Sequence, residues 1–272
     1  MQQVLVRTIT SLYILSVFAY FLFFVTQNKK LGTTGFFLGV SGFVFHCALL
    51  VWRGVLLRHF PVSGLYESLV FFAWLVLAVY LATEVRLRQG TNGVFIMPLV
   101  VSLMAYAASL DSSRRPLAPA LQSPWLSVHV TLCFLGYACF TLAFAFAVMY
   151  LWQERGLKTK KIDAFFFRLP PIEFLDRLGY RSIAFGFIFL TLGIISGSVW
   201  AQNAWGRFWN WDPKETWSLV TWLVYLAYLH GRLALGFRGA KCAVVAIAGF
   251  GAMLFTYFGV SFLLPGLHSY LK

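Results

Sequence analysis

The chain has 272 residues, of which 60% are hydrophobic and only 11% are charged, and its formal net charge is +13. Soluble domains are on average about 45–50% apolar and about 25% charged. This composition therefore excludes an ordinary soluble domain, a disordered chain and a nucleic-acid-binding protein. It predicts an all-α polytopic membrane protein in which residues 1–272 form a single integral membrane domain.

Eight apolar stretches are long enough to cross a bilayer, which takes about 20 helical residues. They cover residues 4–26, 32–52, 64–84, 92–110, 128–152, 181–200, 216–236 and 242–262. The first is too long for a cleaved signal peptide and lacks a cleavage site with small residues. Fourteen of the 22 Lys and Arg residues fall in connections on the side of residues 153–180. The positive-inside rule then places that side in the cytoplasm and both termini outside.

The 28-residue connection 153–180 is basic and is interrupted by Pro170 and Pro171. Its three consecutive phenylalanines, residues 165–167, could lie in the membrane interface; a solvated basic connector is the alternative. The four cysteines lie within or beside apolar stretches without a CxxC pair. They are therefore predicted to be buried structural thiols.

Five tryptophans fall within the 18 residues from Trp200 to Trp217, which we call the Trp segment. An interfacial belt would explain one or two of them at each helix end. The density favours a broad aromatic surface for a large, flat, apolar ligand. Gly206 would allow this ligand to approach the backbone closely, and Arg207 or Lys214 could bind an anionic edge of the ligand. Asp212 followed by a proline also predicts the N-cap of the next helix.

Two of the five histidines share the predicted outer face with the Trp segment. His129 lies at the start of the fifth stretch, and His268 lies just beyond the eighth. A porphyrin on the aromatic surface, with one imidazole on each side of the iron, would account for all three elements. Zinc or copper would also accept imidazole, but neither metal needs such a surface.

The remaining histidines differ in their setting. His230 lies 13 residues after Trp217 on one predicted helix, about 20 Å deeper in the membrane. Ionisable groups inside a span are functional candidates by default, and a histidine bonded to a neighbouring helix is the alternative. Alone, His230 could supply only one axial ligand. His46 is predicted to be structural, and His59 to be interfacial or to position a ligand or a proton.

These residues resemble a known family. The pattern Trp205-Gly206-x-x-Trp209-x-Trp211-Asp212-Pro213-Lys214-Glu215-x-Trp217 is similar to the tryptophan-rich signature of haem-handling membrane proteins. The resemblance is to cytochrome c assembly proteins of the CcsA/ResC type, from the system II pathway. It extends to residues 59–68 and 169–181, and Gly64 replaces an asparagine that is usual in the family.

The resemblance implies a subunit of a cytochrome c synthase that moves haem b outward and attaches it to the CxxCH thiols of apocytochrome c. It implies a CcsB/ResB-type membrane partner, and a thioredoxin-like reductant in the pathway. By position, His129 and His268 resemble the outer iron ligands, and His230 resembles the ligand of an inner site completed by the partner. The haem-presenting surface would comprise Trp205, Gly206, Trp209, Trp211, Asp212 and Trp217.

The expected location is a bacterial plasma membrane, with a thylakoid membrane as the alternative. No residue is an evident nucleophile or general base, so catalysis would work by positioning. One alternative is a haem-delivery protein of the CcmC type, which usually has six spans. Another is a HemX-like protein, which is expected to lack the tryptophan signature. A transporter unrelated to haem would need paired charges within its spans.

Overall fold

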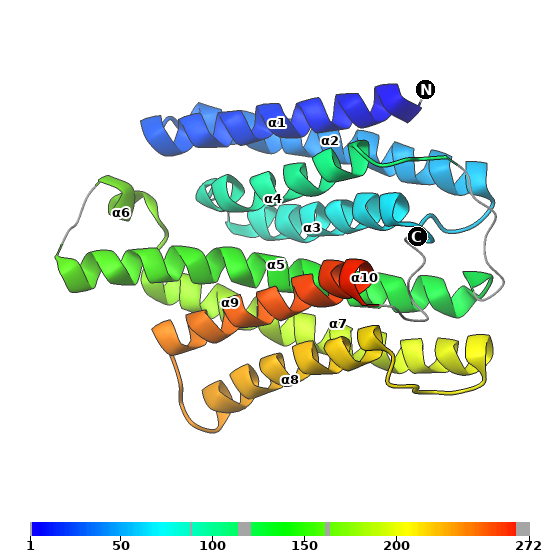
Figure 1. The fold of residues 1–272 in the computed structure, drawn as a ribbon. Coiled ribbons are helices and arrows are strands. Elements are labelled where there is room, and N and C mark those ends of the chain that lie inside the picture. The colour runs from blue at the N-terminus through cyan, green and yellow to red at the C-terminus, as the bar shows by residue number, and fades with distance from the viewer. Residues whose placement is uncertain (1, 88, 114–120, 161–163, 265–272) are drawn as a thin grey trace. The chain divides into compact units, whose positions relative to one another are not determined.

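The computed structural model describes residues 2–87, 89–113, 121–160 and 164–264, and these residues form helices and no strand (Figure 1). The all-α prediction is therefore confirmed. In chain order, the long elements are α1 (Gln2–Thr26), α2 (Lys29–Leu57), α3 (Leu65–Leu87), α4 (Thr91–Ala108), α5 (Pro124–Thr159), α7 (Ile172–Trp205), α8 (Pro213–Leu233) and α9 (Ala240–Leu254). The short ones are α6 (Ala164–Arg168), the π-helix η2 (Phe255–Gly259) and α10 (Val260–Leu263).

Each of the eight predicted spans corresponds to a helix at that place in the chain. Seven of the helical segments in the described residues are long and apolar enough to cross a membrane, counting α9, η2 and α10 as one. The chain is thus a multi-pass membrane protein. Helix α8 is not among the seven, because charged and hydroxylated side chains interrupt its apolar character at both ends. A crossing by α8 stays a prediction.

The chain divides into two compact units. Unit 1 comprises residues 1–115 and 162–170, and unit 2 comprises residues 116–161 and 171–272. Unit 1 therefore contains α1 to α4 together with α6, and unit 2 contains α5 and α7 to α10. That both belong to a single integral membrane domain remains a prediction.

A buried ion pair ties α2 to α3 within unit 1. Arg53 Nη2 donates to Glu67 Oε1 at 2.6 Å, and both side chains are almost fully buried. The guanidinium also donates to Gln2 Oε1 at 2.9 Å and to the Ser112 carbonyl at 2.8 Å. Three acceptors on separate segments compensate the cost of removing this charge from water, so the group fixes one end of unit 1.

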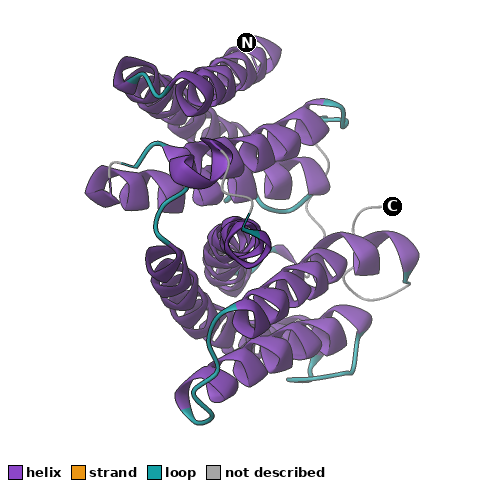
Figure 2. Cartoon of the chain, turned by 90° about the vertical axis from the view of Figure 1, so that its left-hand side faces the viewer, coloured by secondary structure: helices purple, strands orange, loops and turns teal. Residues whose placement is uncertain are grey.

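Unit 2 is built around the contact between α5 and α7, whose backbones approach closely at glycines. A Cβ atom on Gly136 of α5 would lie 3.0 Å from the Gly186 carbonyl oxygen of α7. Small residues permit such close helix packing in membranes. Helix α9 packs against α5, and α8 packs against both α7 and α9. Figure 2 shows the described chain coloured by secondary structure, with the helices in purple and the connections in teal.

The connection 153–180 is shorter than the sequence suggested. Helix α5 continues to Thr159 and α7 begins at Ile172, so most of the expected linker is helical. The chain does break at the two prolines, since Pro171 is the N-cap of α7. Phe167 is 76% exposed, whereas Phe165 packs edge-to-face on Phe24 at 4.9 Å.

Candidate functional site

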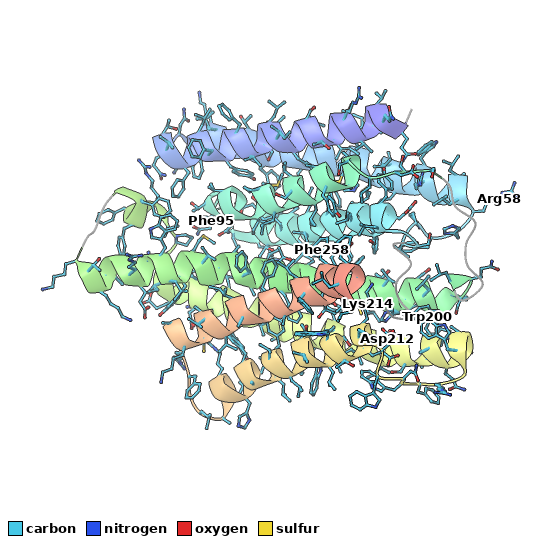
Figure 3. The ribbon with its side chains drawn as sticks, viewed as in Figure 1. Arg58, Phe95, Trp200, Asp212, Lys214 and Phe258 are labelled. Carbon is cyan, nitrogen blue, oxygen red and sulfur yellow. The ribbon has the colours of Figure 1, made fainter. Side chains whose placement is uncertain are left out.

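One end of unit 2 brings together the start of α5, the last turns of α7, the first turn of α8 and the π-helix η2. Ring contacts connect these elements. The rings of His129 in α5 and Trp200 in α7 are stacked, with their centroids 5.9 Å apart. The ring centroids of Trp217 in α8 and Phe255 in η2 lie 4.3 Å apart. In Figure 3, the labelled Trp200, Asp212 and Lys214 lie at this end. The Trp segment and His129 therefore share one end of one compact unit.

The His129 imidazole is held by the backbone of the neighbouring helix. Its Nδ1 lies 2.8 Å from the Gly193 carbonyl oxygen, which can only accept a hydrogen bond. Nδ1 therefore carries a proton, and in the neutral ring the lone pair is on Nε2. The Cys133 Sγ lies 3.7 Å from the same Nδ1 atom. A neutral imidazole with one nitrogen donating to a carbonyl is the usual arrangement of a metal-binding histidine.

Two glycines of α7 make room for this arrangement. A Cβ atom on Gly197 would lie 2.6 Å from both Cε1 and Nδ1 of His129. One on Gly193 would lie 2.6 Å from Cys133 Sγ. Any larger residue at either position would push α5 away from α7. The glycines thus allow the imidazole to reach the Gly193 carbonyl.

The Trp segment is less of a loop than the sequence predicted. Helix α7 continues through Trp205, and α8 begins at Pro213, so only residues 206–212 connect them. Gly206 ends α7 in the left-handed region at φ +74°, and a Cβ atom there would meet nothing within 4 Å. Glycine adopts this conformation without strain, and this explains why position 206 is a glycine. Close approach of a ligand at Gly206 stays a prediction.

The tryptophan rings do not form one flat surface. Trp200 is buried in a small core with Leu121 and Leu126, and Trp205 packs against it at 62°. Trp209 and Trp211 meet at 88°. Aromatic pairs prefer such edge-to-face contacts to parallel overlap. Trp211 is 69% exposed, whereas Trp209 Nε1 is buried without a hydrogen-bond partner among the described residues.

A single carboxylate fixes the connection before α8. Glu215 Oε2 accepts from the backbone N–H of Asn210 at 2.8 Å and from that of Asp212 at 3.1 Å. The buried Asp212 carboxylate accepts from the Lys214 N–H at 2.9 Å, and it also accepts from the Glu215 backbone N–H, which completes the capping box that the sequence predicted in part. Between the two amides bound by Glu215, Trp211 is held at φ +55°, an unusual conformation for a bulky residue.

The two basic residues of the Trp segment, Arg207 and Lys214, have different surroundings. Arg207 Nη1 donates to Asn210 Oδ1 at 3.1 Å. Burial lowers the pKa of Lys214 to about 8, although the nearby Asp212 carboxylate acts in the opposite direction. Lys214 therefore loses its charge near neutral to mildly alkaline pH, much earlier than an ordinary lysine.

Two buried threonines join α8 to η2. Thr256 Oγ1 lies 3.0 Å from the Trp217 carbonyl oxygen and 2.9 Å from Thr221 Oγ1, which itself bonds the Trp217 carbonyl. π-Turns within helices are rare and often occur at functional sites. The described chain ends at Leu264, one residue after α10, and α10 follows η2 directly.

His230 lies far from this end, near the last turn of α8, as the spacing predicted. Its side chain is exposed, as are those of Leu223 and Leu226 on the same helix. Arg232 instead forms a bidentate ion pair with Asp176 of α7, at 2.8 and 2.6 Å. Unit 2 therefore brings His129 and the Trp segment together and keeps His230 apart.

The other histidines fall into three cases. His268 lies outside the described residues, four positions beyond Leu264. His46 is fully buried, with its Nδ1 3.0 Å from the Tyr13 hydroxyl, which fits the structural role that we expected. His59 Nδ1 bonds the Phe60 carbonyl at 3.0 Å.

Three features of this unit were not predicted from the sequence: the glycine contacts of His129, the π-helix and the partner of Arg232. The spacing of Gly186, Gly193 and Gly197 places them on one face of α7, and this pattern could have indicated a close helix contact. No sequence signal marks the π-helix or selects Asp176 among the available carboxylates.

Comparison with known proteins decides the family. The family described as "Cytochrome C assembly protein" matches residues 62–268. The chain belongs to this family. A "Cytochrome c biogenesis protein CcsA" from Heterosigma akashiwo is 38% identical, over 92% of this chain and 89% of that protein. A protein of the same description from Chlorella vulgaris is 42% identical over 81% of this chain and 80% of that protein. Another from Gloeobacter violaceus is 37% identical over 82% of this chain and 81% of that protein.

A solved structure shows the same fold. The "Cytochrome c Heme Lyase CcmF" superposes with a TM-score of 0.65 at 18% sequence identity. The match covers 94% of this chain and 49% of that one. This member of the cytochrome c assembly family thus has the fold of about half of the larger protein.

Proposed function

We propose that this protein is the haem-handling subunit of a system II cytochrome c synthase. It binds haem b as a substrate at the Trp-segment end of unit 2, with His129 and His268 as axial ligands. The observation that carries the proposal is the His129 imidazole, whose Nδ1 bonds the Gly193 carbonyl oxygen in the way that is usual for metal-binding histidines.

Other features of the site suit a haem. The exposed Trp211 offers an aromatic face to a flat apolar ligand. The buried Trp209 Nε1 has a hydrogen to donate and no acceptor among the described residues, and a haem propionate would be a suitable acceptor. In the sequence, His268, the proposed second ligand, comes four residues after Leu264.

The proposed reaction adds the two thiols of the apocytochrome CxxCH motif to the vinyl groups of haem. In each addition the S–H bond and one C=C π bond break, an S–C and a C–H bond form, and no net oxidation occurs. The residues of the site contribute by positioning the reactants. The CxxCH histidine would then replace His129 or His268 before the product leaves.

We also propose that His230 binds haem on its way outward. Its exposed position beside Leu223 and Leu226 would allow a CcsB/ResB-type partner to supply a second ligand. The thiols would be kept reduced by a thioredoxin-like protein.

The proposed topology has eight spans, both termini outside, and a bacterial plasma membrane as the location. Contacts at both ends of helix α8 support the proposal that this helix is one of the eight spans. Arg232 bonds Asp176 near the start of α7, and Trp217 bonds Thr256 near the end of the following span. A helix that runs beside its neighbours over this length is suited to cross the bilayer with them.

The test is an absorption spectrum of the protein, purified in detergent with its CcsB-type partner. The wild type should show a sharp bis-histidine haem spectrum in the reduced state. His129→Ala and His268→Ala should weaken it, with partial recovery in added imidazole, and His230→Ala should lower the amount of haem. His46→Ala provides a control for the loss of a buried histidine. The proposal fails if the wild type lacks haem or if all three variants match it.

Holocytochrome formation in the same cells separates the two activities considered from the sequence. A synthase subunit supports thioether formation on a CxxCH acceptor. A delivery protein would hold haem and leave that acceptor without it.

A further inference from the structure

The Gly193 carbonyl that holds His129 has a second side-chain donor. Ser196 Oγ lies 3.0 Å from the same oxygen atom, while His129 Nδ1 lies 2.8 Å from it. Ser196 is one turn further along α7 and is 6% exposed. Its hydroxyl also lies 2.8 Å from the Leu192 carbonyl oxygen. The one hydroxyl proton of Ser196 thus chooses between two carbonyls, and only one of them is shared with the imidazole.

The strength of the Nδ1–H bond controls how strongly an imidazole donates to a metal. When the acceptor pulls harder on this proton, the ring gains electron density and its other nitrogen becomes a more basic ligand. A more basic ligand stabilises ferric relative to ferrous iron. A carbonyl that already accepts a bond from Ser196 has less density to offer His129. The hydroxyl therefore weakens the effect of the carbonyl on the ring.

We propose that Ser196 is a positioning residue that tunes the redox state of haem held by His129, through the Gly193 carbonyl that the two side chains share. This inference rests on the proposed function. In one orientation of its hydroxyl, Ser196 competes for the carbonyl and favours ferrous haem. In the other, it bonds Leu192 and leaves the carbonyl to His129, which favours ferric haem.

The glycines of α7 make the arrangement sensitive to small displacements. At Gly197, a Cβ atom 2.6 Å from Nδ1 and Cε1 would force the ring out of line with the carbonyl. Gly186 contacts the same helix in the same way, with a Cβ atom 2.5 Å from Phe140, but it lies three turns away from His129. A Cβ atom would be similarly crowded at Gly186 and at Gly197, but only Gly197 lies beside the histidine.

The experiment is a potentiometric titration of the haem-loaded protein with its partner, followed by visible absorption. Ser196→Ala removes the competing donor, so the midpoint potential should fall. At a fixed solution potential the ferric-to-ferrous ratio should rise on the order of threefold, since one neutral hydrogen bond changes an equilibrium several-fold. Thr141→Val is the control. It removes a buried hydroxyl that bonds its own helix, at the Tyr137 carbonyl, and should leave the potential unchanged.

Gly197→Ala should act in the opposite direction, because the displaced ring loses its bond to the Gly193 carbonyl. Its haem should be more easily reduced or less tightly held, whereas Gly186→Ala should match the wild type in both respects. If Ser196→Ala loads no haem, Ser196→Cys replaces the hydroxyl with a weaker donor and should give a smaller shift of the same sign.

The outcomes separate the two levels of the proposal. Haem that depends on His129 but has the same potential in the wild type, Ser196→Ala and Ser196→Cys overturns the role of Ser196 alone. An equal shift in Thr141→Val also overturns it, because the effect would then be a general response to losing a buried hydroxyl. A wild type without haem, or with haem indifferent to His129→Ala, overturns the proposed function instead.

Discussion

The ion pair between Asp176 and Arg232 is expected to stabilise unit 2 substantially, and Asp176→Asn tests this expectation. The bidentate bond joins the first turns of α7 to the last turn of α8, and the two side chains are 20% and 13% exposed. Breaking a fully buried pair costs about 3–5 kcal/mol, whereas an exposed pair contributes about 0.2–1 kcal/mol. Partial exposure places this pair between those limits, at about 2 kcal/mol.

Thermal unfolding in detergent, followed by circular dichroism, measures the effect. A loss of this size should lower the midpoint by about 4–8 °C in a domain of 150–250 residues. Glu154→Gln is the matched control, since it makes the same carboxylate-to-amide change in the pair with Lys158, which is 68% exposed. It should shift the midpoint by no more than about 2 °C.

Two results would refute the reasoning. One is an Asp176→Asn midpoint within 1 °C of the wild type, on the order of experimental error, which would mean that desolvation cancels the attraction. The other is an equal loss in Glu154→Gln, which would mean that the unit responds to any lost carboxylate. Exchanging the two charges, with Asp176→Arg and Arg232→Asp together, should recover part of the lost stability.

Three further predictions concern the Trp segment. Trp211→Gly removes a bulky residue from a strained backbone conformation, so the unfolding midpoint should stay equal or rise, while the haem content should fall. A lower midpoint would show that the backbone at Trp211 is not strained. Because the pKa of Lys214 is lowered from 10.5 to about 8, the unfolded state holds an extra proton between those values, so stability should rise with pH across this window. Lys214→Met should abolish the rise, and a rise that persists would assign it to another group. Thr256→Val should lower the free energy of unfolding by about 1 kcal/mol, because the bond to the Trp217 carbonyl is lost. Thr141→Val is the control, and an equal loss in both variants would show that this bond between helices does not contribute more than a bond within one helix.

Much of the fold followed from simple properties of the chain. Apolar stretches of spanning length mark helices, because unpaired backbone groups are too costly in lipid for other structures. Asp212 and Pro213 marked the start of α8, because capping is a local interaction. Helix ends without such signals were less well predicted, and α7 extends to Trp205 beyond the predicted limit of residue 200.

The candidate site was predictable in composition and less so in geometry. His129 and the Trp segment do share one end of unit 2, because the alternation of spans brings every second connection to one side. The shape of the aromatic surface was not predictable. Whether Trp200 packs into a core or faces outward depends on Leu121 and Leu126, which lie far away in the sequence. The partner of His129 is a backbone carbonyl, and every residue of α7 has one.

The π-helix after α9 has a consequence for how related chains can differ in length. Each residue of a regular helix turns the chain by about 100°, and a π-turn accommodates one additional residue. The residues from Val260 to Leu264 are therefore rotated by about 100° relative to an uninterrupted helix of the same sequence. This rotation compensates for the additional residue, so a relative with one residue fewer and a regular helix at this place would present the following residues on the same face. We expect such relatives to have a deletion of a single residue between Thr256 and Leu264.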